Sequence, residues 1–162
     1  MNDSSVARYP RLTEAVGVLC LLLGLAFLLS LVSYYPTDPS WNTITGAGRA
    51  RNLIGPTGAW VSDIFYQTFG LLSFVIPIAL MWVAWNWVRC RPVEAPVAKV
   101  AGSVLLLLSA CAAVALGPKW HLFGGSVLPA GLTGTVLADW LMESFNYTGA
   151  LIVTCAVLLI SL

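Results

Sequence analysis

The sequence predicts an all-α integral membrane protein with four transmembrane helices. Hydrophobic residues make up 59% of the 162 residues and charged residues only 9%, whereas soluble domains carry about 25% charged residues. The hydrophobic residues are gathered into long uncharged runs that short polar stretches separate. This alternation is typical of membrane-spanning helices rather than of a soluble core.

The first helix is expected over residues 12–35. Its uncharged core, from Ala15 to Val32, rises about 27 Å as a helix, close to the ~30 Å thickness of the hydrocarbon core. A cleaved signal peptide is the alternative, but the run is longer than a signal core and no Ala-x-Ala site follows it. Tyr34 and Tyr35 stand where an interfacial aromatic belt is expected.

The second and third helices are expected over residues 64–88 and 97–117. Three tryptophans crowd the far end of the second run, and Arg89 follows them, which is typical of a helix end at a membrane surface. Pro77 lies within this run and predicts a kink. The third helix has an uncharged core and many small residues, which favour close packing of helices in lipid.

The fourth helix is expected over residues 147–162. Sixteen residues rise only about 24 Å, and no basic residue follows them, so we expect the native protein to continue beyond Leu162. The basic residues favour a cytoplasmic location for both termini and the middle loop. Five lie at the amino terminus and around the middle loop, against three in the outer loops: Arg8, Arg11, Arg89, Arg91 and Lys99, against Arg49, Arg51 and Lys119.

The two outer loops share the pattern GxxGxxxxDxxxxxF, displaced by 76 residues. Gly55, Gly58, Asp63 and Phe69 recur as Gly131, Gly134, Asp139 and Phe145. A duplication would give two parallel helical-hairpin repeats, while four matches at one offset also arise by chance. Each patterned segment either lies on the outer leaflet as an amphipathic helix or extends the following helix outward. The sequence leaves both questions open.

The sequence offers no residues for catalysis, for a cofactor or for a metal ion. The four runs hold no Asp, Glu, Lys, Arg or His, whereas transporters and proton relays normally keep such a residue within the bilayer. No CxxC, GxxxxGK[ST] or GxSxG motif is present. The remaining hypotheses are a membrane anchor or assembly module, a small transporter or channel, and a membrane enzyme with an outer-face site near His121, Asp139 and Glu143.

A resemblance favours the first hypothesis. The stretch SYYPTDPSW from Ser33 to Trp41 resembles the first outer loop of the FtsK/SpoIIIE-type DNA translocases. The segment from Gly55 to Pro77 is similar to that family's entry to its second helix, and the segment that begins at Gly131 is similar to its entry to the fourth. The resemblance covers residues 12–162.

The resemblance implies a four-helix membrane domain at the bacterial division septum, in the inner membrane. In this family a linker, a hexameric ATP-driven motor that pumps double-stranded DNA, and a DNA-reading domain follow that membrane domain. ATP, magnesium and DNA would therefore be bound only by parts that this chain lacks, and this chain would itself be no enzyme. Membrane lipid, further copies of the chain and other division proteins are the expected partners. The residues expected to contact them are Asp38, Pro39, Ser40, Trp41, Gly55, Gly58, Asp63, Gly131, Gly134 and Asp139.

Overall fold

The computed structural model describes residues 10–41, 49–91, 95–118 and 120–161, and within them it contains helices and no strand. The all-α prediction is therefore confirmed. The helices are α1 (Pro10–Val32), α2 (Pro56–Phe69), α3 (Val75–Val88), α4 (Pro96–Leu116) and α5 (Gly131–Ser161), with short 3-10 helices η1 (Gly70–Phe74) and η2 (Phe123–Gly125). Four helical stretches are long and apolar enough to cross a membrane: Arg11–Val32, Pro56–Val88, Pro96–Leu116 and Gly131–Ser161.

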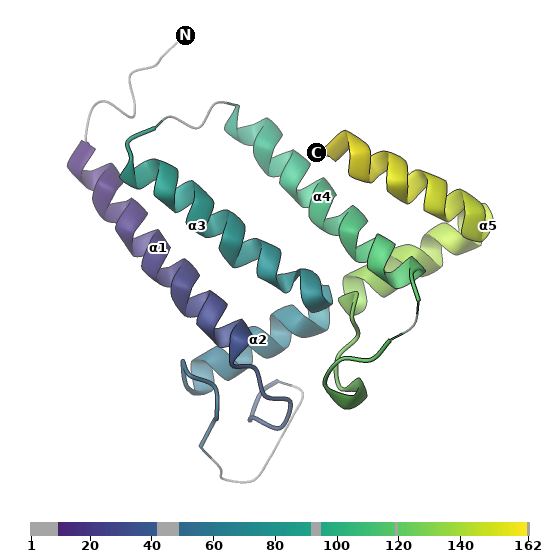
Figure 1. Ribbon diagram of the computed structural model, residues 1–162, viewed down its shortest axis with the longest axis horizontal. Coiled ribbons are helices and arrows are strands. Elements are labelled where there is room, and N and C mark those ends of the chain that lie inside the picture. The colour runs from purple at the N-terminus through teal and green to yellow at the C-terminus, as the bar shows by residue number, and fades with distance from the viewer. Residues whose placement is uncertain (1–9, 42–48, 92–94, 119, 162) are drawn as a thin grey trace.

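The chain forms two helical hairpins that stand next to each other (Figure 1). In the first, α1 packs along α3, and in the second, α4 packs along α5. Small residues allow this close approach: a Cβ atom at Gly17 would lie 2.8 Å from the side chain of Val88, and one at Gly24 would lie 2.6 Å from that of Met81. Small faces are thus used for packing inside each hairpin, where dispersion contacts rather than hydrophobicity drive association.

The expected second helix, 64–88, is divided in two. α2 ends at Phe69, η1 follows, and α3 begins at Val75. The reason is Gly70, whose φ of +58° lies outside the right-handed helical region. Pro77 does not itself cause the break, because it falls in the first turn of α3, where a proline interrupts no established helical hydrogen bond.

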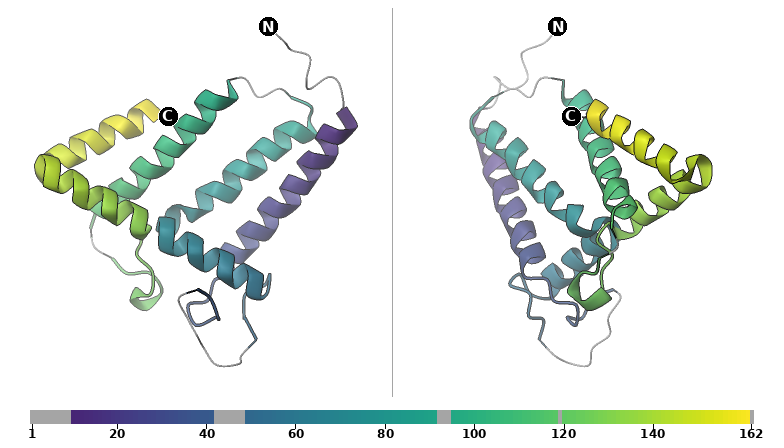
Figure 2. Two further views of the ribbon diagram at one scale, coloured as in Figure 1. Left: turned by 180° about the vertical axis from the view of Figure 1, so that it is seen from behind. Right: turned by 45° about the vertical axis from the view of Figure 1, so that its right-hand side comes forward.

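A bend of the same kind divides α5. Asn146 has a φ of +55° and separates residues 131–145 from residues 147–161. Gly70 and Asn146 are themselves 76 residues apart, the offset that relates the two sequence patterns. Each hairpin therefore has the same order: a helix, an outer loop, an oblique segment, a bend and a returning helix (Figure 2). Neither oblique segment continues straight into the helix that follows it.

A cluster of buried side chains joins the two hairpins at the end where the outer loops lie. It contains Leu31, Tyr34, Tyr66 and Val127, with Phe27, Phe65, Phe74 and Leu122 packed around it. The ring of Phe123, in the second outer loop, lies 5.1 Å from that of Tyr34 and 5.5 Å from that of Tyr66. Tyr34 is only 8% exposed, so the expectation that it belongs to an interfacial belt is wrong. The aromatic loop that covers it comes from a distant part of the chain.

The oblique segments meet at two glycines. A Cβ atom at Gly70 would collide with the carbonyl group of Pro129, and one at Gly131 would collide with the backbone of Thr68. The N–H of Leu71 also donates to the carbonyl oxygen of Pro129, at 2.9 Å. The two hairpins therefore pack backbone against backbone at the outer end.

Candidate functional site

The aspartate of the DPSW motif organises the first outer loop. The carboxylate of Asp38 accepts two hydrogen bonds, from the backbone N–H groups of Arg51 and Asn52, both at 2.9 Å. Asp38 is only 5% exposed. Hydrogen bonds to a carboxylate are stronger than neutral ones, so this side chain holds together the two ends of the loop that leads from α1 to α2.

Asn52 connects this loop to both neighbouring helices. Its side-chain amide donates to the carbonyl oxygen of Ser30, at 2.8 Å, and the hydroxyl of Ser30 donates to the carbonyl oxygen of Gly58, at 2.7 Å. A side chain at Gly58 would collide with Asn52 and Ile54. A glycine is therefore required at position 58, because Asn52 and Ile54 pack directly against its backbone. Gly55, with a φ of +80°, precedes α2 in a conformation that favours glycine.

Asp63 lies in α2 and accepts a hydrogen bond from a tyrosine. The hydroxyl of Tyr34 donates to Asp63 Oδ1, at 2.9 Å, while Oδ2 has no hydrogen-bond partner within the described part of the chain. Burial, with the nearby Asp63 carboxylate as a further cause, raises the pKa of Tyr34 well above its usual range. Asp63 is 3% exposed. It is therefore a structural group, which ties α2 to the residues that follow α1.

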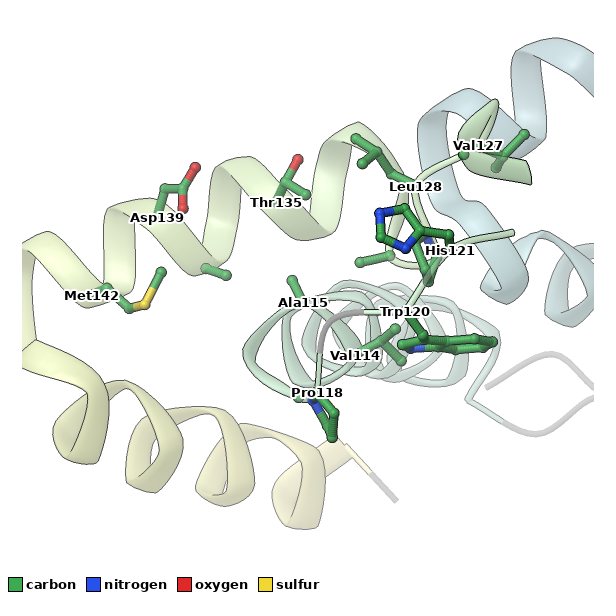
Figure 3. Close-up of a pocket in the computed structure, with 15 residues that line it drawn as sticks. Val114, Ala115, Pro118, Trp120, His121, Val127, Leu128, Thr135, Asp139 and Met142 are labelled. Carbon is green, nitrogen blue, oxygen red and sulfur yellow. The ribbon is translucent and has the colours of Figure 1, made fainter. Parts of the chain in front are cut away.

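The corresponding aspartate of the second repeat has different surroundings. Asp139 is exposed and lines a pocket of about 420 Å³, together with His121, Thr135 and Met142 (Figure 3). Glu143 does not line this pocket. The structure thus brings together two of the three residues of the hypothetical outer-face enzyme site. Across the described residues, no group of three His, Cys, Asp or Glu side chains is placed to hold a metal ion.

The remaining candidate residues divide into exposed and packed ones. The side chain of Trp41 is 77% exposed, with its ring 6.0 Å from that of Trp60. Pro39 and Ser40 are half-buried, as is Gly55, while Gly131 and Gly134 are buried. A Cβ atom at Gly134 would lie 2.5 Å from the carbonyl oxygen of Cys111. Among the residues expected to contact partners, only Trp41 and Asp139 present exposed side chains.

Sequence reasoning missed the groups that bind the loops together. Ser30, Asn52, Tyr66 and Phe123 carry no motif, and they come from four different elements or loops. Tyr66 donates to the carbonyl oxygen of Leu31, at 3.2 Å. No spacing in the sequence pointed to these groups, because their partners lie in other elements of the chain.

Residues 10–162 match the family described as the 4TM region of DNA translocase FtsK/SpoIIIE. The chain belongs to this family. The resemblance of the DPSW loop and the Gly-x-x-Gly segments is therefore confirmed, and the two divided hairpins form the family's four-helix region.

Several curated relatives are named DNA translocase FtsK. The protein from Vibrio vulnificus (strain CMCP6) is 32% identical over 164 residues, which cover 94% of this chain and 16% of the relative. The protein from Vibrio parahaemolyticus (serotype O3:K6, strain RIMD 2210633) is 28% identical over 160 residues, or 94% of this chain and 15% of the relative. That from Rickettsia prowazekii (strain Madrid E) is 48% identical over 63 residues, or 39% of this chain and 8% of the relative. No solved structure gives a significant match.

Proposed function

We propose that this chain is the membrane anchor and assembly domain of a bacterial division-associated DNA translocase. The observation that carries the proposal is the match of residues 10–162 to the 4TM region of such translocases. The chain spans only about 16% of the length of the first relative. ATP hydrolysis with magnesium, DNA binding and hexamer formation are therefore assigned to parts of the protein outside this chain.

The anchor acts by position and packing rather than by chemistry. The start of α1 and the end of α5 lie at the same end of the molecule, away from the outer loops. Arg89, Arg91 and Lys99 lie close in sequence to the helix ends at this side, which favours its placement in the cytoplasm. A motor that follows the chain would then face the chromosome. The domain would sit in the inner membrane, at the division septum.

We place the contact with other division proteins on the exposed outer surface. Trp41 supports this, because a large exposed aromatic side chain is a typical anchor of protein interfaces. Asp139 supports it from the second hairpin, as an exposed carboxylate at the edge of a pocket. Asp38, Gly58 and Asp63 would contribute indirectly, by holding the loop that presents Trp41.

The test is septal recruitment in dividing cells. The full chain, fused at its carboxyl end to a fluorescent protein, should concentrate at division sites. Trp41→Ala should abolish most of that enrichment while membrane insertion and abundance remain unchanged. The matched control is Trp85→Ala, which removes an exposed tryptophan from α3, far from the outer loops. Uniform distribution of the unaltered chain around the membrane would overturn the targeting role. Equal enrichment of the chain and its Trp41→Ala variant would remove Trp41 from the contact surface.

The translocase assignment itself has an independent test. The gene can be read beyond the codon for Leu162. An in-frame linker followed by a GxxxxGK[ST] motif supports the motor, because that motif cradles nucleotide phosphates. A stop codon directly after Leu162 would remove the motor from the proposal.

A further inference from the structure

We propose that the groove between α3 and α4 binds one tail of an anionic phospholipid, with the lipid headgroup at Lys99. The groove is a pocket of about 460 Å³. One wall is formed by residues of α3, among them Val75, Ala79 and Trp87. The other is formed by residues of α4, among them Pro96, Lys99 and Ser103.

The groove exists because the contacts that pack the two hairpins together gather at the outer end, while at the other end only the chain itself leads from α3 to α4. The main contacts are made by α2 and η1 with α4 and α5, and by the outer loops. The small faces of the helices are already used inside the hairpins, as at Gly17 and Ala84. The walls of the groove are mostly aromatic or branched side chains. In lipid no hydrophobic force closes such a gap.

The dimensions of the groove match one lipid tail in one leaflet. From Val75 to Trp87 the wall rises about 18 Å along the helix, and one leaflet of the hydrocarbon core is about 15 Å deep. The lining is mostly apolar, and its one hydroxyl, that of Ser103, already donates to the carbonyl oxygen of Lys99, at 2.7 Å. A hydrocarbon chain therefore satisfies the groove along its length.

The charge at one end of the groove identifies the headgroup. The cation Lys99 lines the groove in the first turn of α4, across from Trp87 at the end of α3. Arg89 and Arg91 follow α3 on the same side. A juxtamembrane cluster of this kind attracts anionic lipids rather than zwitterionic ones. A second copy of the chain would bring the same cations to this end, and the bulky walls disfavour a docked helix.

The experiment is native mass spectrometry of the full chain, titrated with phosphatidylglycerol or phosphatidylethanolamine carrying the same tails. We expect phosphatidylglycerol to be retained more strongly, with one tightly bound molecule per chain. Lys99→Gln should weaken its binding about fivefold, while Arg49→Gln, on the outer face, should leave it unchanged. Ala79→Phe fills the groove and should remove the bound lipid, while Ala156→Phe, an exposed position on α5, should not.

Three results would overturn the proposal. The first is equal retention of both lipids by the unaltered chain, and the second is equal binding by the Lys99→Gln and Arg49→Gln variants. The third is a dimer that Ala79→Phe dissociates, which would identify the groove as an interface between copies. Circular dichroism shows whether each variant is folded, and Lys99→Gln, at a solvent-exposed side chain, keeps the test decisive if Ala79→Phe does not fold. The test does not depend on septal recruitment, so the two proposals fail separately.

Discussion

The two hairpins have the same architecture, but the aspartate at the equivalent position is buried in one and exposed in the other. Asp63 and Asp139 occupy equivalent positions, 76 residues apart. Asp63 is buried and bonded to Tyr34, whereas Asp139 is exposed at a pocket. A repeated sequence pattern therefore predicts a repeated backbone, but it does not predict a repeated role for the side chains on it.

The difference follows from the outer loops. Twenty-three residues, 33–55, separate α1 from α2, and their described part includes Asp38 and Asn52. Their hydrogen bonds close the loop and fix it to the end of α1. Fourteen residues, 117–130, separate α4 from α5. This shorter loop sends Phe123 and Val127 across to the first hairpin instead. The first loop thus stabilises its own hairpin through hydrogen bonds, and the second loop stabilises the packing of the two hairpins against each other.

Substitutions at the two bends give the strongest test of how the two hairpins differ. Gly70 and Asn146 have nearly equal φ angles, +58° and +55°, and at Gly70 the backbone of the other repeat, at Pro129, also leaves no room for a side chain. Gly70→Asn should destabilise the protein by roughly 3 kcal/mol or more, because the left-handed conformation and a backbone clash act together. Asn146→Gly should stabilise it by about 1 kcal/mol, through relief of strain alone. Thermal unfolding in detergent measures both changes, and equal effects of opposite sign would show that Gly70 carries no packing constraint.

The next largest effect is expected at Asp38, which has no counterpart in the second loop. Asp38→Ala leaves the backbone N–H groups of Arg51 and Asn52 without their acceptor, one of them buried. The expected loss of unfolding free energy is about 2–3 kcal/mol. Thr57→Ala, at an exposed position in the first turn of α2, serves as the control and should cost much less. Denaturant unfolding followed by circular dichroism compares the two, and similar values would argue against this stabilisation of the loop.

The paired aspartates test the comparison directly. Asp63→Ala leaves the buried hydroxyl of Tyr34 unpaired and should destabilise the fold by about 1–2 kcal/mol. Asp139→Ala, at an exposed side chain, should change stability by less than about 0.5 kcal/mol. Asp63→Asn should recover part of the loss, because its amide oxygen still accepts from Tyr34. If the two alanine variants were equally stable, Asp63 and Asp139 would differ only in exposure, and the hydrogen bond from Tyr34 to Asp63 would not stabilise the fold.

The smallest effect is expected at Trp41. The side chain is 77% exposed, so Trp41→Ala should change the unfolding free energy by no more than about 0.5 kcal/mol. Its expected consequence is the loss of septal recruitment. A large loss of stability in the purified variant would instead assign Trp41 to the loop structure that Asp38 stabilises, through its contact with Trp60.

The sequence by itself determined the class of protein and the approximate helices. Uncharged apolar runs must become helices in a bilayer, because every backbone hydrogen bond has to be made within the segment. The pattern repeated at an offset of 76 residues also marked the two segments that precede the bends at Gly70 and Asn146, although it predicted neither bend. The motifs of the first outer loop were enough to indicate the family.

Only the tertiary structure decided what those motifs do. Asp38, Gly58 and Asp63 are conspicuous in the sequence, but their partners Asn52, Ser30 and Tyr34 are not, because a hydrogen bond between loops depends on distance in space rather than on spacing in the chain. The division of residues 64–88 was likewise hidden, since Gly70 reads as an ordinary small residue of an apolar run. Its left-handed conformation is fixed by the backbone of Pro129, which the second hairpin brings against it.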